Sequence, residues 1–211
     1  MRPRVKICGI TNLEDALLTA RLGADALGFI FYEKSPRYVS PQKAATIIQQ
    51  LPPFVTPVGV FVSTQRESIQ TIIQQTRVRA IQLSGDETPR DCTGFIVPVI
   101  KSFRIRKLED IDSVRNYTIS AAMLDGASDR EYGGSGTLAD FTIAKEIRKF
   151  HLLILAGGLH LDNILDAVLA TQPYAIDLSS GVESQPGKKD PEKLQLLFKR
   201  LQSLSTVSTT K

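Results

Sequence analysis

The sequence predicts an α/β protein that folds as a single-domain (β/α)8 TIM barrel, on three observations. Short apolar, β-branched runs alternate with amphipathic helical patterns along the chain, which is typical of a parallel sheet wrapped by helices. Eight such strand–helix units can be counted, and eight is the number that closes a barrel. The 211 residues are 42% hydrophobic, enough for one well-buried core. Because alternation alone does not show closure, an open doubly wound sheet is the competing architecture.

The N-terminal half of the chain contains the first four units. An apolar run over Val5–Cys8 predicts the first strand, and the helical pattern over Leu13–Leu22 ends at Gly23, a residue type common at helix C-termini. The segments expected next are strand Ala26–Phe31, loop Tyr32–Ser40, helix Pro41–Leu51, strand Pro57–Val62, helix Glu67–Thr76 and strand Ala80–Leu83. Over Ser84–Pro89 only a short helical turn is expected.

The C-terminal half contains the other four units and a polar tail. The expected segments are strand Val97–Ser102, a short helix near Leu108–Val114, strand Ala121–Leu124, helix Asp140–Lys149, strand Leu152–Leu155, helix Leu161–Leu169, strand Ala175–Leu178 and helix Pro191–Leu204. The glycine-rich stretch Gly126–Thr137 is either a lid that excludes water or a plain disordered connection. We expect residues 1–204 to form the barrel and the small, polar tail 205–211 to be frayed.

The charge and the cysteine and histidine content narrow the class of protein. The net charge is +4 and the pI about 9.1, with basic residues spread along the chain, which suits a small anionic molecule and only weakly suggests nucleic acid. The two cysteines, Cys8 and Cys92, and the two histidines, His151 and His160, lack metal-ligand spacing, so no metal is expected. No apolar run approaches the ~20 residues of a membrane span and no signal-peptide core is present, so we expect a cytoplasmic protein without membrane contact.

Two loops predict a phosphate site. In barrels, the loops after strands seven and eight commonly bind phosphate through backbone amides. Gly157 and Gly158 lie in the first of these loops, and Ser179, Ser180 and Gly181 lie in the second. Each loop alone also reads as ordinary turn residues, but their occurrence at the two matching positions favours phosphate.

Other candidate functional side chains follow strand ends, where barrels place their chemistry. Cys8 ends the first strand, and Lys6, two residues earlier, shares its face; Lys6 would lower the thiol pKa, contact a substrate or form a structural ion pair. Asp125 follows strand six as an acid, a base or a turn residue. Asp177 lies in strand eight, and Arg37 in the loop after strand two suits a substrate carboxylate unless it is merely solvated.

Together these pieces resemble one family, phosphoribosylanthranilate isomerase of tryptophan biosynthesis. The matching stretches are Val5–Thr11, Gly23–Phe29, Ser35–Arg37, Val58–Val62, Gln82–Glu87, Leu124–Asp125, Gly133–Gly136, Leu155–Leu159, Asp177–Glu183 and Pro186–Asp190. They occur in the right order over essentially the whole chain. The resemblance implies a (β/α)8 barrel and a small anionic substrate, without cofactor or metal, in a monomer or homodimer.

The resemblance also implies a reaction and residue roles. The reaction is an Amadori rearrangement of N-(5-phosphoribosyl)anthranilate, an aminoaldose, to a 1-deoxyribulose aminoketose. Position by position, Cys8 matches the general base, Asp125 the general acid, Arg37 the residue facing the anthranilate carboxylate and Asp177 a substrate-contacting carboxylate. The phosphate site matches Gly157, Gly158, Ser179, Ser180 and Gly181. Keeping Asp125 protonated near pH 7 requires its pKa to rise by about 3 units.

The chain departs from the family pattern at two places. Ser84 stands where the family usually has His, which alters a polar contact at the end of strand four. Thr137 and the pair Asp140–Phe141 stand where the family tends to have Lys and an Asp–Trp pair, which alters the contacts of the lid. Neither departure touches Cys8 or Asp125.

Two rival functions come from different classes. The histidine-pathway isomerase performs the same rearrangement on another aminoaldose, but it has a carboxylate at the end of strand one and two phosphate sites in similar half-barrels. This chain has Cys8 at that position and no second glycine-rich cradle after strands three and four, which also disfavours a bifunctional enzyme. The second rival is a catalytically silent phosphate-binding barrel that acts as a scaffold or sensor. The presence of both Cys8 and Asp125 opposes it, whereas Ser84, in place of the family's usual His, keeps this alternative open.

Overall fold

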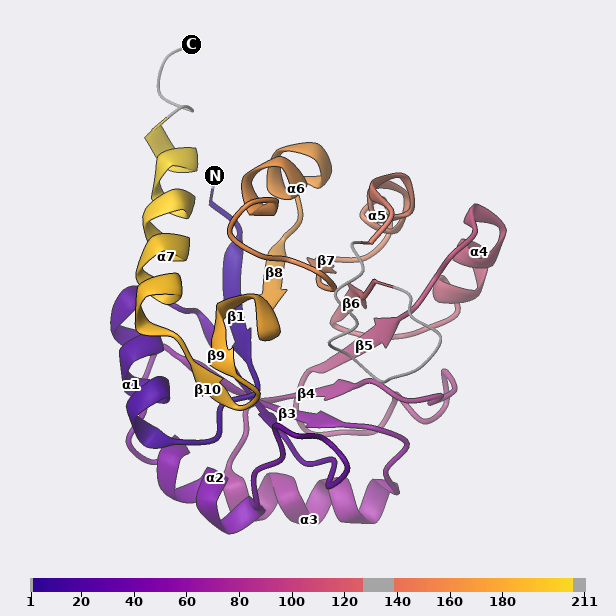
Figure 1. Cartoon of the computed structure of the whole chain (residues 1–211). Helices are drawn as coiled ribbons and strands as arrows, with labels where there is room; N and C mark the ends of the chain where they lie inside the picture. The colour runs from indigo at the N-terminus through magenta and orange to yellow at the C-terminus, as the bar shows by residue number, and fades with distance from the viewer. Residues whose placement is uncertain (1, 127–138, 207–211) are drawn as a thin grey trace.

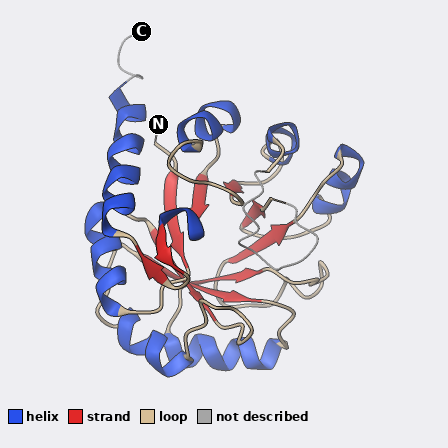
Figure 2. Cartoon of the chain, in the orientation of Figure 1, coloured by secondary structure: helices blue, strands red, loops and turns tan. Residues whose placement is uncertain are grey.

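The computed structural model describes residues 2–126 and 139–206, and it is a closed barrel of eight parallel strands surrounded by helices (Figures 1 and 2). The strands are β1 Arg4–Cys8, β2 Ala26–Ile30, β3 Thr56–Phe61, β4 Ala80–Leu83, β5 Val99–Phe103, β6 Ala121–Leu124, β7 Leu153–Leu155 and β8 Ala175–Leu178. The first strand pairs with both β2 and the last strand, with Lys6 opposite Ala26 on one side and Asp177 on the other. The barrel prediction is therefore confirmed, and the open sheet is wrong.

The helices lie outside the ring of strands. They are α1 Leu13–Leu22, α2 Pro41–Ile48, α3 Arg66–Thr76, α4 Ile111–Val114, α5 Phe141–Ile147, α6 Ile164–Thr171 and α7 Pro191–Thr206, with short 3-10 helices η1 Leu108–Asp110 and η2 Ser180–Val182. Helix α1 ends at Gly23 as predicted, in a left-handed conformation with φ 105° that glycine adopts without strain. At its start, the side chain of Asn12 accepts a hydrogen bond from the Asp15 amide.

Several boundaries differ from the sequence prediction. Residues 84–98, between β4 and β5, form turns without a helix, and β5 begins only after Pro98, which has no N–H to donate to the sheet. Helix α6 begins at Ile164, three residues later than predicted, because the side chain of Asn163 bonds back to the Gly158 carbonyl and the His160 amide. Helix α7 continues to Thr206, two residues into the predicted tail; residues 207–211 lie outside the described chain.

A short antiparallel hairpin between η2 and α7 was not predicted. It consists of β9 Glu183–Gln185 and β10 Lys188–Lys189. Its strands are too short and too polar to produce an alternating pattern. Three contacts fix the hairpin to the rest of the barrel: the Lys189 amide donates to Asp15 of α1, Thr11 donates to the Gly187 carbonyl, and Lys193 of α7 donates to the Glu183 carbonyl. The hairpin is thereby held beside the carboxyl end of β1.

The core has two parts. The larger part fills the layer between strands and helices, where Ile7 and Leu27 of the sheet pack with Ala16 and Leu197 of the helices. The smaller part consists of alanines and larger apolar residues inside the barrel, namely Ala121, Met123, Ile154, Ala156 and Ala175, with Ile100 packed against them. Within the described residues, no helix is long and apolar enough to cross a membrane.

Candidate active site

A cavity of about 440 Å³ opens at the carboxyl ends of the strands. The predicted site residues that line it are Cys8, Arg37, Asp125, Gly157, Gly158, Asp177, Ser179 and Ser180. Gly181 is not among the described residues that line the cavity; it lies behind, where a Cβ would come 2.1 Å from the Leu159 carbonyl oxygen. Candidate residues from the two ends of the chain and from its middle thus line one cavity.

The thiol of Cys8 occupies space that Gly28 leaves open. The two residues are paired across β1 and β2, and a Cβ on Gly28 would lie 2.7 Å from Sγ of Cys8. Burial raises the pKa of the Cys8 thiol above its ordinary value, and the charge of Lys6 offsets this only in part. In the free protein the thiol is therefore held protonated.

Lys6 forms a buried ion pair with Asp177. Its Nζ lies 2.8 Å from Oδ1 of Asp177, and the two residues are directly paired between β1 and β8. Burial would lower the pKa of Lys6, but the charge of Asp177 and the hydrogen bond to it raise the pKa above its ordinary value. Of the three possibilities that the sequence left open for Lys6, the structure contains the ion pair, and the ammonium also has a lowering influence on the thiol pKa.

Asp125 follows β6 and is partly buried at the cavity wall. Burial and the negative charge of Asp177 raise its pKa to about 6, against a lowering influence from Arg104. This is a smaller rise than the sequence argument required. Gly157, with φ 76°, makes room for the carboxylate, since a Cβ there would lie 2.7 Å from Oδ1 of Asp125 and 2.0 Å from the Gly126 nitrogen.

Residues of the loops after β7 and β8 line the cavity beside Cys8 and Asp125. Within the described chain, the N–H groups of Gly157, Gly158, Ser180 and Gly181 donate to no internal acceptor. Unpaired amides in a loop and at the start of a short helix suit an anion. The hydroxyl of Ser179 donates to the Cys8 carbonyl at 3.2 Å, which connects the loop after β8 to the end of β1.

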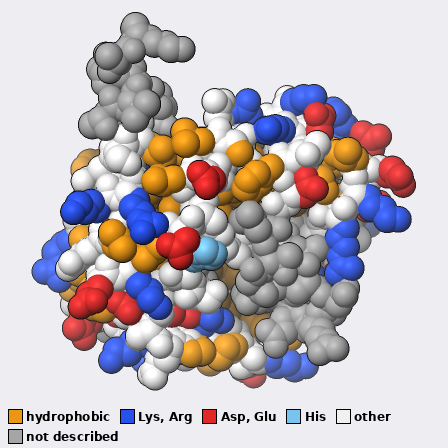
Figure 3. All heavy atoms as spheres, turned by 45° about the horizontal axis from the view of Figure 1, so that its top comes forward, with side chains coloured by type: hydrophobic (Ala, Val, Ile, Leu, Met, Phe, Trp, Pro, Cys, Tyr) orange, Lys and Arg blue, Asp and Glu red, His pale blue; other side chains and the backbone are white. Residues whose placement is uncertain are grey.

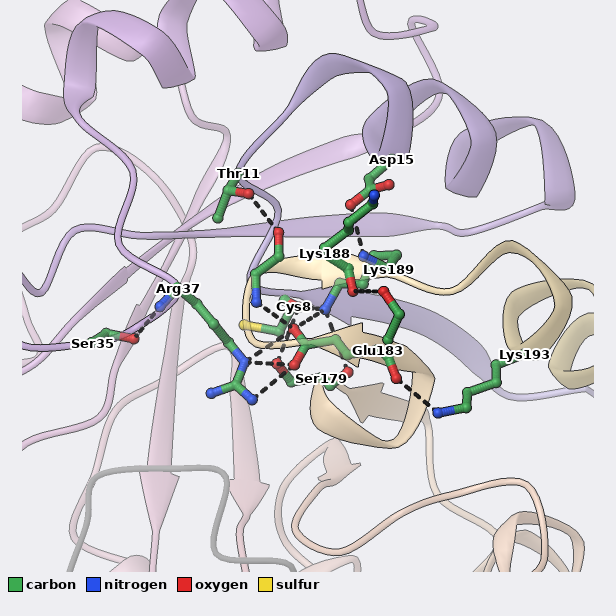
Figure 4. Close-up of polar contacts among 12 residues, drawn as sticks. Cys8, Thr11, Asp15, Ser35, Arg37, Ser179, Glu183, Lys188, Lys189 and Lys193 are labelled. Atoms are coloured by element: carbon green, nitrogen blue, oxygen red, sulfur yellow. Dashed lines mark hydrogen bonds and ion pairs between the residues drawn. The ribbon is translucent and has the colours of Figure 1, made fainter.

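Arg37 reaches the cavity from the loop after β2. Its Nε lies 3.0 Å from both carboxylate oxygens of Glu183, and its Nη2 lies 2.8 Å from Oε2 (Figure 4). The remaining nitrogen, Nη1, has no hydrogen-bond partner among the residues that the structure describes. Arg37 is therefore oriented by protein on one edge and open on the other.

Sequence reasoning missed several polar residues at the site, among them Gln82 in the cavity lining and Glu183 and Lys189 next to Arg37. Gln82 of β4 is buried at the cavity wall; its Nε2 donates to Ser84 at 3.0 Å, while its Oε1 has no partner in the described chain. Ser84 thus makes a polar contact at the position where the family usually has His. Glu183 holds Arg37, and Lys189 in turn bonds to Glu183. A glutamine inside an apolar strand was a usable signal for Gln82. Glu183 and Lys189 lie within two stretches that match the family, Asp177–Glu183 and Pro186–Asp190, but their local sequence gives no sign of a role.

The remaining cysteine and the histidines lie elsewhere. Cys92 is buried, and burial raises its pKa to about 11. His151 contacts the Val114 carbonyl through Nε2, and His160 accepts from the Asp162 amide. Among the described residues no cluster of His, Cys, Asp and Glu is arranged to hold a metal ion. These residues have structural or solvated positions.

The predicted lid lies almost entirely in residues 127–138, outside the described chain. Of the residues that differ from the family pattern after it, Asp140 caps α5 by accepting from the Thr142 and Ile143 amides at 2.7 and 3.2 Å. Figure 3 shows basic and acidic side chains interspersed over the described part of the face that it presents. This pattern agrees with the even spread of charge along the sequence.

The fold and cavity define a (β/α)8-barrel protein with an acid, a thiol and an amide-lined pocket at its strand ends. Residues 5–200 match the family model described as N-(5'-phosphoribosyl)anthranilate isomerase. A relative of that name from Geobacter metallireducens is 47% identical over 93% of this chain and 98% of its own. The crystal structure of the isomerase from Thermotoga maritima has a TM-score of 0.89 and 40% identity, over 95% of this chain and 99% of that one.

A further solved structure contains a ligand. It is an isomerase of the same name in complex with reduced 1-(o-carboxyphenylamino)-1-deoxyribulose 5-phosphate, with a TM-score of 0.85 and 39% identity, covering 95% of this chain and 99% of that chain. The chain therefore belongs to the N-(5'-phosphoribosyl)anthranilate isomerase family, a family of isomerases. The resemblance stated from the sequence is confirmed.

Proposed function

We propose that this chain isomerises N-(5'-phosphoribosyl)anthranilate in tryptophan biosynthesis, converting the aminoaldose into 1-(2-carboxyphenylamino)-1-deoxyribulose 5-phosphate. The observation that carries the proposal is the placement of Cys8 and Asp125 on the wall of one cavity that is also lined by three residues with unpaired amides, Gly157, Gly158 and Ser180. An aldose–ketose isomerisation needs an acid and a base on one sugar. Unpaired backbone amides on the cavity wall supply the site for its phosphate.

Asp125 acts as the general acid in this proposal. It donates its proton to the furanose ring oxygen, and the ring opens to a Schiff base. With a pKa of about 6, roughly one molecule in ten carries this proton at pH 7. A bound phosphate ester would raise that fraction, because its negative charge further disfavours ionisation of the carboxyl.

Cys8 acts as the general base. As a thiolate it takes the proton from C2 of the Schiff base, and the resulting enolamine tautomerises to the ketone. Burial disfavours the thiolate, while the nearby ammonium groups of Lys6 and Lys189 favour it. The reactive form is therefore a minority form with a protonated Asp125 and an ionised Cys8, and the two groups titrate as a coupled pair.

The remaining residues bind the substrate. Arg37 faces the anthranilate carboxylate, and Asp177, fixed by Lys6, contacts the sugar. Gly157, Gly158, Ser179, Ser180 and Gly181 form the phosphate site, with Gly181 contributing backbone only. No cofactor or metal takes part in the proposed reaction.

The proposal extends to the state of the protein. One solved structure contains monomers that were generated from the dimeric isomerase of Thermotoga maritima. Both states are thus represented among similar proteins, which supports a monomer or homodimer here. A role in amino-acid biosynthesis supports a cytoplasmic location.

The test follows the fluorescence of the anthranilate group as the substrate is consumed. We expect wild-type protein to turn over phosphoribosylanthranilate, and Cys8→Ser and Asp125→Asn each to lose about 10²- to 10⁴-fold in kcat, with binding of the reduced product analogue kept within about threefold. Cys92→Ser, a buried cysteine remote from the cavity lining, is the control and keeps wild-type turnover. Absence of turnover in the wild type overturns the function, whereas near-wild-type turnover in either variant removes that residue from the mechanism.

A further inference from the structure

Lys189 is a lysine without solvent contact. Its side chain is 0% exposed, and its Nζ donates to the Cys8 carbonyl at 2.6 Å, to Glu183 at 2.8 Å and to the Ser179 carbonyl at 3.4 Å (Figure 4). A buried ammonium is costly unless its protons are bonded and its charge is balanced. Three acceptors, one of them a carboxylate, meet both conditions, so Lys189 is charged and fixed at the point where β1 and β8 end.

Glu183 shares its carboxylate between two cations. Oε1 accepts from Lys189 and from Nε of Arg37, and Oε2 accepts from Nε and Nη2 of Arg37. Burial alone would raise the pKa of Glu183, but its bonds to Arg37 and the charge of Lys189 lower it below its ordinary value. The carboxylate therefore stays ionised and links the β9–β10 hairpin to the loop after β2.

The way Arg37 is held leaves a defined part of it available. Glu183 occupies the edge formed by Nε and Nη2, and the opposite fork, formed by Nη1 and the second proton of Nη2, has no partner in the described chain. Arg37 lines the cavity, whereas Glu183 and Lys189 are not among its described lining residues. A planar fork of this kind matches a carboxylate bidentately.

The charges of Arg37, Glu183 and Lys189 also favour a bound carboxylate. Arg37 and Lys189 contribute two positive charges and Glu183 one negative charge, which leaves one positive charge beside the cavity. One substrate carboxylate on the open fork would complete the balance. The pairing also removes the freedom of a long side chain before the ligand arrives, so less entropy is lost on binding.

We propose that Glu183, anchored by Lys189, is a positioning residue that holds the guanidinium of Arg37 with its open fork toward the anthranilate carboxylate of the substrate. This inference rests on the proposed function, because it takes Arg37 to be the carboxylate-binding residue. Glu183 itself does not touch the ligand. Its effect falls mainly on the carboxylate end of the substrate, because within the described chain the Glu183 carboxylate accepts from Arg37, Lys189 and the Gly187 amide and from no residue of the phosphate site.

The test compares two ligands in Glu183→Gln. The variant keeps the size of the side chain but loses the charge that fixes Arg37. We expect the Kd of reduced 1-(o-carboxyphenylamino)-1-deoxyribulose 5-phosphate to rise about tenfold or more, since a charge-assisted hydrogen bond contributes on that scale. Ribose 5-phosphate, which lacks the aryl carboxylate, should bind within about twofold of wild type because its phosphate contacts are unchanged.

Lys193→Met is the matched control for the hairpin. Lys193 donates to the backbone carbonyl of Glu183 at 2.7 Å and so holds the same hairpin without touching the carboxylate. We expect it to weaken both ligands equally or neither. If Glu183→Gln also weakens both ligands by the same factor, the residue only supports the hairpin, and the positioning role is overturned.

A double variant tests whether Glu183 acts through Arg37. If it does, adding Glu183→Gln to Arg37→Ala changes the Kd of the carboxylate-bearing analogue by less than about twofold. A further loss as large as in the wild-type background would overturn the inference. An Arg37→Ala variant that binds the analogue as wild type does would instead remove Arg37 from the proposed function, and absent turnover in the wild type would remove the function itself.

Discussion

Two buried lysine–glutamate pairs lie on different sides of the barrel. Lys189 and Glu183 join at 2.8 Å beside β1 and β8, and Lys101 and Glu87 join at 2.9 Å beside β4 and β5. All four side chains are less than a tenth exposed. By residue type, distance and burial the two pairs are nearly the same.

The two pairs differ in the further groups to which their charged side chains bond. Lys101 also donates to the carbonyls of Leu83 and Gly85, and Oε1 of Glu87 accepts from the amides of Ser63 and Gly85. All of these bonding partners are groups of the protein itself, and neither Lys101 nor Glu87 is among the described lining of the cavity. The pair at β1 and β8 instead includes Arg37, which still has an open fork. A closed network supports loops, while an open one is prepared for a ligand.

The largest effect that would sharpen this comparison is a loss of folding stability when the Lys101–Glu87 pair is broken. Lys101→Met leaves Glu87 charged and buried without its partner, so we expect the free energy of unfolding in urea to fall by about 3–5 kcal/mol. The kcat/KM of the folded fraction should stay near that of wild type. Lys149→Met, at the exposed Lys149–Glu146 pair, is the control and should cost less than about 1 kcal/mol. A loss at Lys101 as small as at Lys149 would break the comparison.

For Asp125, on the wall of the cavity, we expect a smaller effect on the free energy of unfolding, and one of opposite sign. The pKa of Asp125 in the folded protein, about 6, exceeds the ordinary 3.8, so its contribution to stability is full below about pH 4 and is lost as pH rises through 6. At neutral pH the ionised carboxylate costs the fold about 3 kcal/mol. Asp125→Asn lacks this titration.

The measurement is urea unfolding of wild type and Asp125→Asn at about pH 4.5 and about pH 7.5. The stability of the variant relative to wild type should increase by about 2 kcal/mol between these two values. A difference that does not change with pH would mean that the pKa of Asp125 is not raised in the folded state. The same buried carboxyl thus weakens the fold and supplies the proposed acid.

Much of the fold was predictable because it is periodic. Eight apolar strands and their helices repeat along the chain, and Gly23 marks a helix end by its chemistry alone. What escaped prediction is short and polar. The β9–β10 hairpin has strands of three and two residues, and its contacts to Asp15 and Thr11 span more than 170 positions.

The candidate site was predictable to the extent that chemistry follows strand ends. Cys8, Asp125 and the two phosphate loops could be named for that reason, and the family resemblance added their roles. Glu183 gave no local signal, because a glutamate after a turn is usually solvated and its partner Arg37 is 146 positions away. The space that Gly28 leaves for the thiol likewise appears only when β1 and β2 are paired.

The most direct test of the proposed acid–base pair compares turnover and thiol ionisation over pH. In a Cys92→Ala background, which leaves one thiol, the alkylation rate of Cys8 by iodoacetamide reports its ionisation, with a midpoint expected above the ordinary 9.0. Because the reactive form has Asp125 protonated and Cys8 ionised, kcat/KM should be nearly flat from about pH 6 to that midpoint and fall about tenfold per pH unit above it. A kcat/KM that instead rises through the alkylation midpoint would contradict the pair, since it would mean that no proton from Asp125 is needed.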